Sequence, residues 1–328
     1  MGKQKRTRII GIFLLLLLAA LSVLSLAVGK YPLTPSLLFG GDVQAARVFF
    51  TLRLPRTCTA MVGGIGLGVA GYVFQTVFRN PLAAPDIIGV SSGASAGAAF
   101  GILFLSSGML SVTLAAFAGG LAAVLLTLSL SALVPRRGGA TIVLAGIAVH
   151  SLAQTLLMVL KLTADPEKEL ASIEYWMMGS LSGVTLYRLP VCGIICLLGT
   201  AGIFLLHRQV LMLSVEDGEA RMLGVDVGKL RFGVLLLATL ITASVVSVTG
   251  LISFIGLLAP HGARLAAGDD RLPTLVFSGL SGGVLLLAAD ILARGVTGGE
   301  LPVSIFTSLL GAPFLLYLMF GGEGRPWG

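Results

Sequence analysis

The feature that most constrains this chain is a series of long stretches without a charged residue. The longest runs from Ile87 to Pro135, 49 residues without Asp, Glu, Lys or Arg. A helix needs about 20 apolar residues to cross the hydrocarbon core of a bilayer. Only 11% of the residues are charged and 56% are hydrophobic, which excludes a soluble globular protein and intrinsic disorder. The sequence therefore predicts an all-α polytopic membrane protein.

These stretches divide into ten predicted membrane spans. The stretch from Ile87 to Pro135 is long enough for two spans, with a break near Ser106 and Ser107. The predicted spans cover residues 9–28, 57–78, 87–105, 109–135, 138–160, 189–206, 232–250, 251–266, 272–293 and 303–321. Because ten is an even number, both termini are expected on the same side, and residues 1–328 are expected to form one transmembrane domain.

Basic residues indicate which side faces the cytoplasm. Lys3, Lys5, Arg6 and Arg8 precede the first span, and cytoplasmic flanks are enriched in Lys and Arg. With both termini inside, fourteen basic residues are inside and eight are outside. Residues 175–187 carry no charge but are too short to cross, so they are expected to form an interfacial helix on the outer face. The inner basic residues beyond the first span are Arg79, Arg136, Arg137, Arg208, Arg221, Lys229, Arg231, Arg264, Arg271 and Arg325.

The segment 213–231 is too highly charged to lie in lipid. Seven of its nineteen residues are ionisable, so it must lie in water, between the sixth and seventh spans on the cytoplasmic side. Ser214 followed by Asp217 predicts the start of a short helix. Gly224 is expected to end it in a left-handed conformation, and Asp226 to cap a second short turn. This segment is either a docking element for a soluble partner or an ordinary solvated loop.

Three arginines on the outer side run against the charge bias. Arg53 and Arg56 flank Pro55 at the outer entrance of the second span, and Arg294 lies at the outer end of the ninth. One interpretation is that they anchor the spans at the membrane surface, with Arg294 paired to Asp290 four residues earlier. The other is that they dock an acidic external partner.

Helix-breaking residues mark candidate parts of a transport path. A proline-containing motif after the second span ends that span abruptly on the cytoplasmic side. Pro260 is expected to end the short eighth span, and Pro313 to kink the tenth. Interrupted helices of this kind are typical of transport proteins. The motif that forms this cytoplasmic mouth consists of Arg79, Asn80, Pro81 and Pro85.

Two further features lie inside predicted spans. His150 is midway along the fifth span, one turn before Gln154, and either lines a path or packs with a hydrogen bond in the interior. Gly64 and Gly68 form a GxxxG pair, which is interpreted as close packing within one chain rather than a seam between two chains.

The sequence contains no motif for catalysis, for a cofactor or for a metal. We find no P-loop, no GxSxG and no metal-ligand cluster, and Cys58, Cys192 and Cys196 are interpreted as packing residues. The net charge of +7 comes mostly from the flanks of spans, not from a nucleic-acid patch. Asp290 is the only carboxylate clearly within a span, so the buried carboxylates of a proton-driven transporter are missing. Energy for transport is therefore expected from a partner; the alternative is a secondary transporter or channel that works alone.

Several motifs, taken in order, resemble those of the FecCD-type permease subunits of ABC importers for ferric siderophores, haem and cobalamin. The resemblance runs from about Arg53 to Leu318. The motifs that carry it are Arg53-Leu54-Pro55-Arg56; Gln75 with Arg79-Asn80-Pro81-Leu82-Ala83 and Pro85; Trp176 with Gly179-Ser180-Leu181; Gly250 with Phe254-Ile255-Gly256-Leu257; Pro260-His261 with Arg264; Ala289-Asp290 with Ala293-Arg294; and Glu300-Leu301-Pro302 with Gly311-Ala312-Pro313.

The resemblance implies a transport assembly in a bacterial cell membrane. It implies a homodimer, two ATPase subunits on the cytoplasmic face that bind ATP and Mg²⁺, and an extracytoplasmic substrate-binding protein. This chain would then be no enzyme, would bind no cofactor or metal itself, and would contact lipid but no nucleic acid. The resemblance also implies a path along the two-fold axis, lined by the fifth and tenth spans. His150, Gln154 and Pro313 are expected near this path only because of their positions in these two spans.

The resemblance also implies residue roles. Residues 213–231 would form the coupling helices, in which Glu219-Ala220 with Gly224 is similar to the EAA…G signature of importers, although Arg221 replaces the second Ala. The outer arginines Arg53, Arg56 and Arg294 would dock the binding protein. Residues 176–183 look most like permeases for a ferric siderophore, with haem or cobalamin as alternatives. The residues implied in coupling are Glu216, Asp217, Glu219, Ala220, Arg221, Leu223 and Gly224.

Overall fold

The computed structural model describes residues 3–33, 37, 40, 42–105, 108–134, 139–268, 272–296 and 299–321. Over these ranges the chain is helical and contains no β-strand, so the predicted all-α class is confirmed. The predicted break at Ser106 and Ser107 lies outside the described residues. So do four basic residues used for the orientation, namely Arg136, Arg137, Arg271 and Arg325.

Helices long and apolar enough to cross a membrane number six in the described part of the chain. One of them is formed by α3, a π-helical segment η1 and α4 in continuous succession, from Val43 to Val77. The bounds of these long helices are α1 (Lys3–Ala27), α3 (Val43–Arg47), η1 (Val48–Arg53), α4 (Leu54–Val77), α6 (Met109–Leu133), α7 (Gly139–Thr163), α12 (Val227–Thr249) and α14 (Leu272–Gly295).

The remaining helices are shorter. Four of them follow predicted spans and are mainly apolar: α5 (Val90–Phe104), α9 (Leu189–Leu205), α13 (Ile255–Ala267) and α15 (Val303–Gly321). The others connect them or lie at the two ends of the molecule: η2 (Pro85–Ile88), α8 (Glu169–Met177), α10 (His207–Met212) and α11 (Asp217–Met222).

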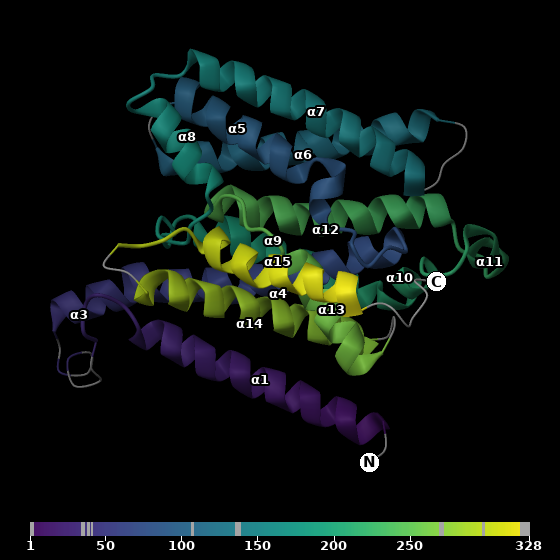
Figure 1. Cartoon of the computed structure of the whole chain (residues 1–328), viewed down its shortest axis with the longest axis horizontal. Helices are drawn as coiled ribbons and strands as arrows, with labels where there is room; N and C mark the ends of the chain where they lie inside the picture. The colour runs from purple at the N-terminus through teal and green to yellow at the C-terminus, as the bar shows by residue number, and fades with distance from the viewer. Residues whose placement is uncertain are drawn as a thin grey trace.

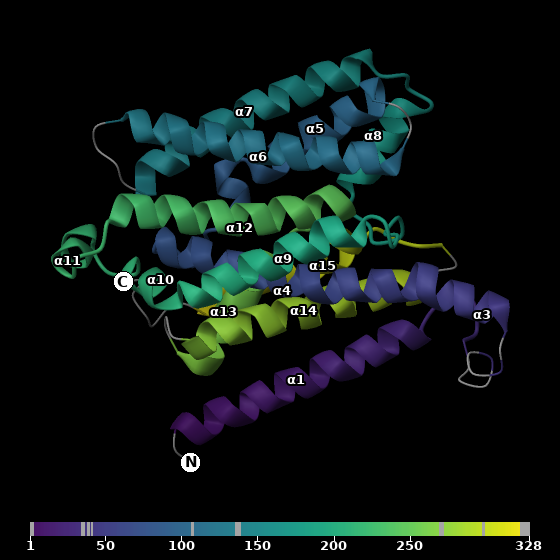
Figure 2. The ribbon, with the colours of Figure 1, turned by 180° about the vertical axis from the view of Figure 1, so that it is seen from behind.

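The helices pack around α4, which is buried along most of its length. α4 contacts α9, α12, α13 and α14, and α1 lies against the outer side of α14 (Figure 1). On the far side of α12, α5, α6 and α7 form a second group with α8 at its end. Seen from behind, α9 runs between α12 and α4 (Figure 2). α11 lies at one end of the molecule, and α3 and α8 at the other.

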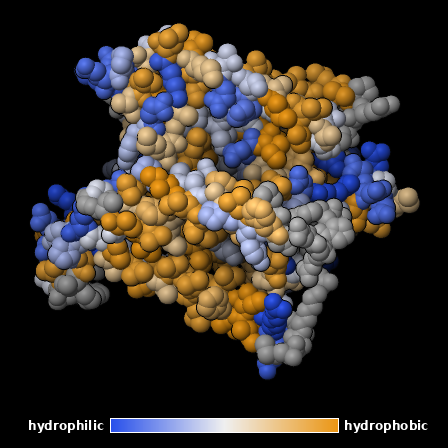
Figure 3. Space-filling view, viewed as in Figure 1, coloured by the Kyte–Doolittle hydropathy of each residue, from blue (hydrophilic) through white to orange (hydrophobic). Residues whose placement is uncertain are grey.

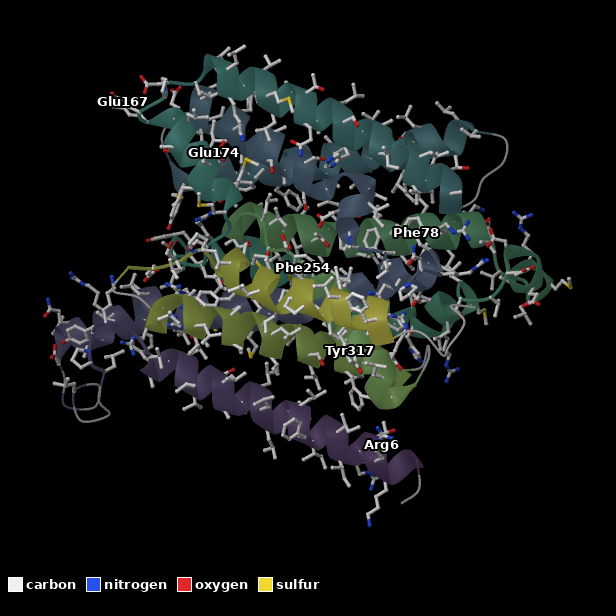
Figure 4. The ribbon with its side chains drawn as sticks, in the orientation of Figure 1. Arg6, Phe78, Glu167, Glu174, Phe254 and Tyr317 are labelled. Atoms are coloured by element: carbon white, nitrogen blue, oxygen red, sulfur yellow. The ribbon has the colours of Figure 1, made fainter. Side chains whose placement is uncertain are left out.

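Side-chain polarity follows this arrangement. Hydrophobic residues dominate the surface between the two ends, and hydrophilic residues gather at the α3 end and at the α11 end (Figure 3). Glu167 and Glu174 lie at the end opposite α11, where Lys161 Nζ is 2.8 Å from Glu174 Oε1 (Figure 4). This distribution is that of a protein surrounded by lipid along its middle.

Glycines allow α4 to pack backbone to backbone. A Cβ on Gly64 would lie 2.5 Å from the carbonyl oxygen of Gly282, and one on Gly68 would lie 2.0 Å from that of Ser278, both on α14. Since real Cβ atoms do not approach so closely, no larger residue fits at either position without moving a helix. The prediction that this GxxxG pair packs within the chain is confirmed.

The position predicted for the interfacial helix, residues 175–187, is wrong. The helix is α8, Glu169–Met177, which takes in part of the charged segment before it. The helix ends because the backbone that follows it bonds to other segments. Gly179 adopts a φ of 70°. Ser180 N donates to Thr249 O at 2.7 Å, and Val303 N donates to Gly179 O at 3.0 Å. This turn ties the end of α12 to the start of α15.

Pro260 does not end α13, which continues to Ala267. A residue other than proline at 260 would donate its N–H to the carbonyl of Gly256, four residues earlier. That carbonyl lies against α4, because a Cβ on Gly71 would be only 1.8 Å from it. Because the Gly256 carbonyl packs against α4, a proline at 260 is tolerated inside α13. The sequence alone predicts that this proline ends the helix.

Candidate functional site

At the α11 end of the molecule, Asp217 accepts hydrogen bonds from two arginines of different segments. Arg231 Nη2, on α12, donates to Asp217 Oδ1 at 2.8 Å, and Arg79 Nη2 donates to the same oxygen. Arg79 Nε also donates to the carbonyl of Leu213 at 3.2 Å. We call Arg79, Asp217 and Arg231 the Asp217 latch, because together they join the residues after α4 to α11 and α12.

The local sequence explains how Asp217 is placed. Gly224 adopts a φ of 81° after α11, and Asp226 Oδ1 accepts from Lys229 N at 3.2 Å, so the predicted left-handed end and the predicted cap are both confirmed. The second helix is the start of α12 itself, not a separate turn. The predicted start at Ser214 is wrong: Ser214 Oγ donates back to Leu211 O at 2.7 Å, and the N-cap is Glu216.

Other predicted coupling residues surround the latch on α11. Ala220 is buried, whereas Glu216, Glu219 and Arg221 are exposed. Leu223 is 65% exposed. An apolar side chain that projects into water from a charged helix is the kind of surface that a protein partner covers.

Two open recesses flank the latch. One, of about 490 Å³, is lined by Phe78, Arg79, Gly139 and residues 216–218, so it separates α11 from the start of α7. The other, of about 320 Å³, is lined by Asp217, Arg221 and the first residues of α12. Asp217 and Arg231 line both recesses, and the latch is the wall between them.

The latch sets the charge state of Asp217. Burial alone would raise the pKa of the Asp217 carboxyl, but hydrogen bonds and positive charges from Arg231 and Arg79 outweigh this effect and hold the pKa below its usual range. Asp217 is therefore an anion at neutral pH, and the three side chains form a charged network rather than a single surface ion pair.

The cytoplasmic-mouth motif, predicted separately, meets the coupling segment through this latch. Arg79 has a φ of 48°, an uncommon value for a residue with a side chain. Asn80 Oδ1 then accepts from Leu82 N at 2.9 Å, and Pro85 begins η2. Pro81 lies between them in a turn without helical structure. The described motif therefore links the end of α4, through η2, to the start of α5.

At the opposite end, a group of buried charges joins α4 to α14. Arg56 Nε donates to Asp290 Oδ1 at 2.8 Å, and Arg56 Nη1 donates to Glu300 Oε2 at 2.9 Å. Arg294 Nη2 is 2.8 Å from Asp290 Oδ2, so the predicted pair four residues apart is confirmed. The Asp290 side chain is completely buried and Glu300 lies at the rim, with 36% of its side chain exposed.

Two of the outer arginines also bind the end of α1. Arg53 Nη1 donates to the carbonyls of Leu26 and Ala27 at 2.7 and 2.6 Å. Arg294 Nη1 donates to the carbonyls of Ser25 and Val28, each at 3.1 Å. The last carbonyls of a helix carry partial negative charge and lack partners within the helix, so these guanidinium groups cap α1.

The outer arginines are buried in the chain, which bears on their predicted docking role. Arg53, Arg56 and Arg294 are 5%, 7% and 9% exposed, and their guanidinium groups bond to oxygens within the chain. Docking of an external partner at these arginines stays a prediction, and it would require a carboxylate of that partner to displace an internal oxygen. The interpretation of Arg294 as the partner of Asp290 describes their geometry better.

The pathway candidates lie on two different helices. His150 is exposed and Gln154 is partly exposed on α7, one turn apart, and Pro313 is exposed on α15 without interrupting it. Pro313 follows Gly311, which packs against the ring of Phe254: a Cβ on Gly311 would lie 2.3 Å from that ring, which lies next to α15 in Figure 4.

Sequence reasoning overlooked two structurally important residues. Arg231 was counted as a charge but not as a partner of Asp217. Arg188 is 4% exposed and donates to Thr113 Oγ1 at 2.9 Å and to Val248 O at 2.9 Å, which fixes the loop before α9 to α6 and α12. The only signal for Arg188 was its position directly before an apolar run, which is also where surface anchors occur.

Comparison with known proteins places this architecture in a family. The FecCD transport family matches residues 15–321. The chain is 37% identical to the cobalamin import system permease protein BtuC of Halobacterium salinarum over 88% of this chain and 77% of that one. It is also 37% identical to a probable iron chelatin transport system permease protein of Helicobacter pylori, over 84% and 83% of the two chains.

A solved structure has the same fold along nearly the whole chain. It is described as an inward-facing conformation of a putative metal-chelate type ABC transporter, and it shares 32% of its residues with this chain. The match has a TM-score of 0.87 and covers 95% of this chain and 99% of the other. The chain therefore belongs to the FecCD transport family, as a multi-pass membrane permease of an ABC importer that is not itself the ATPase.

Proposed function

We propose that this chain is the permease of an importer for a ferric siderophore, and that residues 213–231 receive the movement of the ATPase. The observation that carries the coupling proposal is the bridging of Asp217 by Arg79 and Arg231. A force on α11 acts through this carboxylate on α12 and on the segment that leads to α5. The residues proposed for coupling are Glu216, Asp217, Glu219, Ala220, Arg221, Leu223 and Gly224.

The proposed topology has ten spans with both termini in the cytoplasm. The six long apolar helices, together with α5, α9, α13 and α15, supply ten segments at the predicted places. The start of α1 and the end of α15 lie towards the α11 end (Figure 1), which supports a common side for both termini. α11 would then face the cytoplasm, where an ATPase binds, and α3 and α8 would face outward.

The proposed assembly is a homodimer with two ATPase subunits at the α11 end and a binding protein at the α3 end. Docking of the binding protein through Arg53, Arg56 and Arg294 requires its carboxylates to compete with internal oxygens. Glu300 is the point where this competition is easiest, because its contact with Arg56 lies at the rim. A carboxylate of the partner that replaces Glu300 would gain a charge-assisted hydrogen bond from Arg56.

A purified complex in proteoliposomes tests the coupling proposal. We expect Glu219→Arg and Gly224→Trp to abolish ATP-driven uptake while the ATPase subunit alone retains its activity. Arg208→Glu is the matched control, an exposed charge reversal at the same end but outside the coupling segment. Uptake that is unchanged in both coupling variants would contradict the assignment, and a chain that transports without any ATPase would instead support a secondary transporter.

The cargo is tested on the partner binding protein. We expect the binding protein that co-purifies with this permease to bind ferric siderophores more tightly than haem or cobalamin. The related permeases named for cobalamin and for iron chelatin have the same identity to this chain, so identity alone does not choose between these cargoes. Tight binding of haem or cobalamin alone would contradict the siderophore assignment and leave the coupling assignment standing.

A further inference from the structure

The segment between α4 and α5 reaches halfway along α7. A Cβ on Gly146 of α7 would lie 2.2 Å from the carbonyl of Ile87, and a Cβ on Gly89 would lie 3.5 Å from the backbone N of His150. At 1.5 Å per residue, Gly146 and His150 lie roughly 10 and 16 Å from the start of this 25-residue helix. η2 and Gly89 therefore lie roughly 10 to 16 Å into α7, inside the predicted span and not at its edge.

Ionisable and polar side chains meet at this depth. Ser91 Oγ donates to Asp86 Oδ1, so the first turn of α5 holds the carboxylate. Asp86 belongs to the turn that packs beside His150 of α7, since a Cβ on Gly89 would lie 3.5 Å from His150 N. Asp86 and His150 are both exposed in the chain, and Ser91 is partly exposed. An acidic group and an imidazole at this depth require water or protein, because lipid does not solvate them.

The exposed surface of α7 has one apolar side. Leu152, Leu156 and Val159 lie at i, i+4 and i+7, and each is more than half exposed. A surface of this composition suits contact with lipid.

Next to η2, α7 exposes polar side chains together with Ile147 and Met158. His150 and Gln154 are one turn apart, and so are Ser151 and Thr155. The hydroxyls of Ser151 and Thr155 donate to carbonyls of their own helix, at 2.9 Å each, so their oxygens remain available as acceptors. Hydrophilic residues also occur away from the two ends on the face drawn in Figure 3. The polar groups of α7 at the depth of η2 therefore lie on the side with His150, and this side is the one that can face an aqueous path.

We propose that Asp86, Ser91 and His150 form a cargo-contacting station halfway along the transport path, which favours metal chelates with positive charge or outward N–H and O–H groups over anionic chelates. This inference rests on the proposed function, since it needs a path between the two ends. The Asp86 carboxylate supplies negative charge to the path, and the low-dielectric walls of a water-filled path strengthen its field. The Ser91 hydroxyl orients that carboxylate, and the His150 ring adds a donor or an acceptor.

Thiol labelling of the assembled transporter tests whether the station is wet and negative. Ser151→Cys is introduced with Cys58→Ser, because Cys58 is the one cysteine of the chain that is not buried. A cationic and an anionic methanethiosulfonate of similar size are then compared. We expect both reagents to react, with the cationic one faster, and we expect Asp86→Asn to reduce the ratio of the two rates by roughly three- to tenfold.

Controls make the labelling result decisive. Leu152→Cys, on the apolar side of α7, should react with neither reagent. Absence of labelling at Ser151→Cys, or a rate ratio that Asp86→Asn leaves unchanged, would overturn the proposal. Because labelling needs no transport, these outcomes are independent of the coupling and cargo tests.

Uptake gives the second measurement. In proteoliposomes that contain the permease, its ATPase and its binding protein, Asp86→Asn should speed uptake of an anionic ferric tris-catecholate or slow uptake of a cationic ferric trihydroxamate, whichever the binding protein accepts. His150→Gln should alter the uptake of the same chelate while Leu152→Ala does not. Unchanged uptake in Asp86→Asn would overturn the proposed selection by charge.

Discussion

Arg56 Nε donates to Asp290 Oδ1 at 2.8 Å, and this bond joins α4 to α14 in the interior. Arg294 Nη2 approaches the other oxygen of the same carboxylate at 2.8 Å. One anion therefore contacts two buried cations, and Glu300 at the rim supplies the second negative charge. Such a group is stable as a unit, because each buried charge has a partner.

Asp290→Asn should strongly destabilise the protein. It leaves Arg56 and Arg294 buried with a neutral partner, and breaking a buried pair typically costs ~3–5 kcal/mol. The cost should fall towards the lower figure, because Arg56 keeps Glu300. The measurement is the midpoint of thermal unfolding in detergent. Glu300→Gln is the control at the rim and should cost ~1 kcal/mol or less. Equal losses of stability in the two variants would contradict the expectation that the buried Asp290 contributes more than Glu300.

Charge reversal at the outer end tests docking. Arg56→Glu should weaken association with the binding protein, most clearly at low salt where screening is least. Arg47→Glu, an exposed reversal at the same end, is the control for general electrostatic attraction. Association is measured by surface-immobilised binding at two salt concentrations, with folding checked by gel filtration. An equal effect of both variants would indicate long-range attraction only, not a specific contact of Arg56.

The sequence was sufficient where a contact is local. Gly224 and Asp226 were predicted from helix-end chemistry, and the pairing of Asp290 with Arg294 from a spacing of four residues. Such contacts depend on one helix or one turn, whose geometry is the same in most proteins. Ser214 shows the limit of this reasoning, because its hydroxyl binds Leu211 O within the preceding turn instead.

Contacts between distant segments were not predictable in this way. Arg79 and Asp217 are 138 positions apart, and Arg188 and Thr113 are 75 apart. Each side chain has a plausible local role as a surface anchor, so its partner is decided by how helices pack and not by its neighbours in sequence. The burial of the outer arginines follows from the same cause: α1 ends beside them, and its last carbonyls need donors.

Because α4 and α14 approach closely at Gly68, we expect that no larger side chain fits there without loss of stability. Gly68→Val should destabilise by at least the ~1–3 kcal/mol that overpacking costs, because its Cβ would lie 2.0 Å from Ser278 O and the backbone must move. Gly193→Val on α9 is the matched control, since a Cβ there meets nothing within 4 Å. Yield and thermal midpoint in detergent provide the readout. A control as unstable as Gly68→Val would show that valine, not the contact, is responsible.

Removal of the Asp217 latch should uncouple ATP hydrolysis from transport. Asp217→Asn keeps the shape of the side chain but removes the charge that binds Arg79 and Arg231. We expect the complex to assemble and hydrolyse ATP, with uptake per ATP reduced several-fold. Asp226→Asn is the control, a neighbouring carboxylate whose only ion pair in the described residues is with Lys229. Full coupling in Asp217→Asn would show that α11 acts without the latch.

The low pKa of Asp217 predicts how the contribution of the latch to stability depends on pH. Arg231 and Arg79 hold this pKa below its usual range despite the opposing effect of burial, so folding favours the ionised form. A depressed carboxyl pKa contributes stability above the unfolded value of about 3.9, and this stability is lost as pH falls through the folded pKa. The difference in thermal midpoint between wild type and Asp217→Asn should therefore be constant between about pH 6 and 8 and shrink below about pH 4. Arg231→Gln should raise the pKa of Asp217 and move the loss to higher pH. A difference that instead disappears as pH rises towards 8 would have the wrong sign for a carboxylate, and would assign the effect to another group.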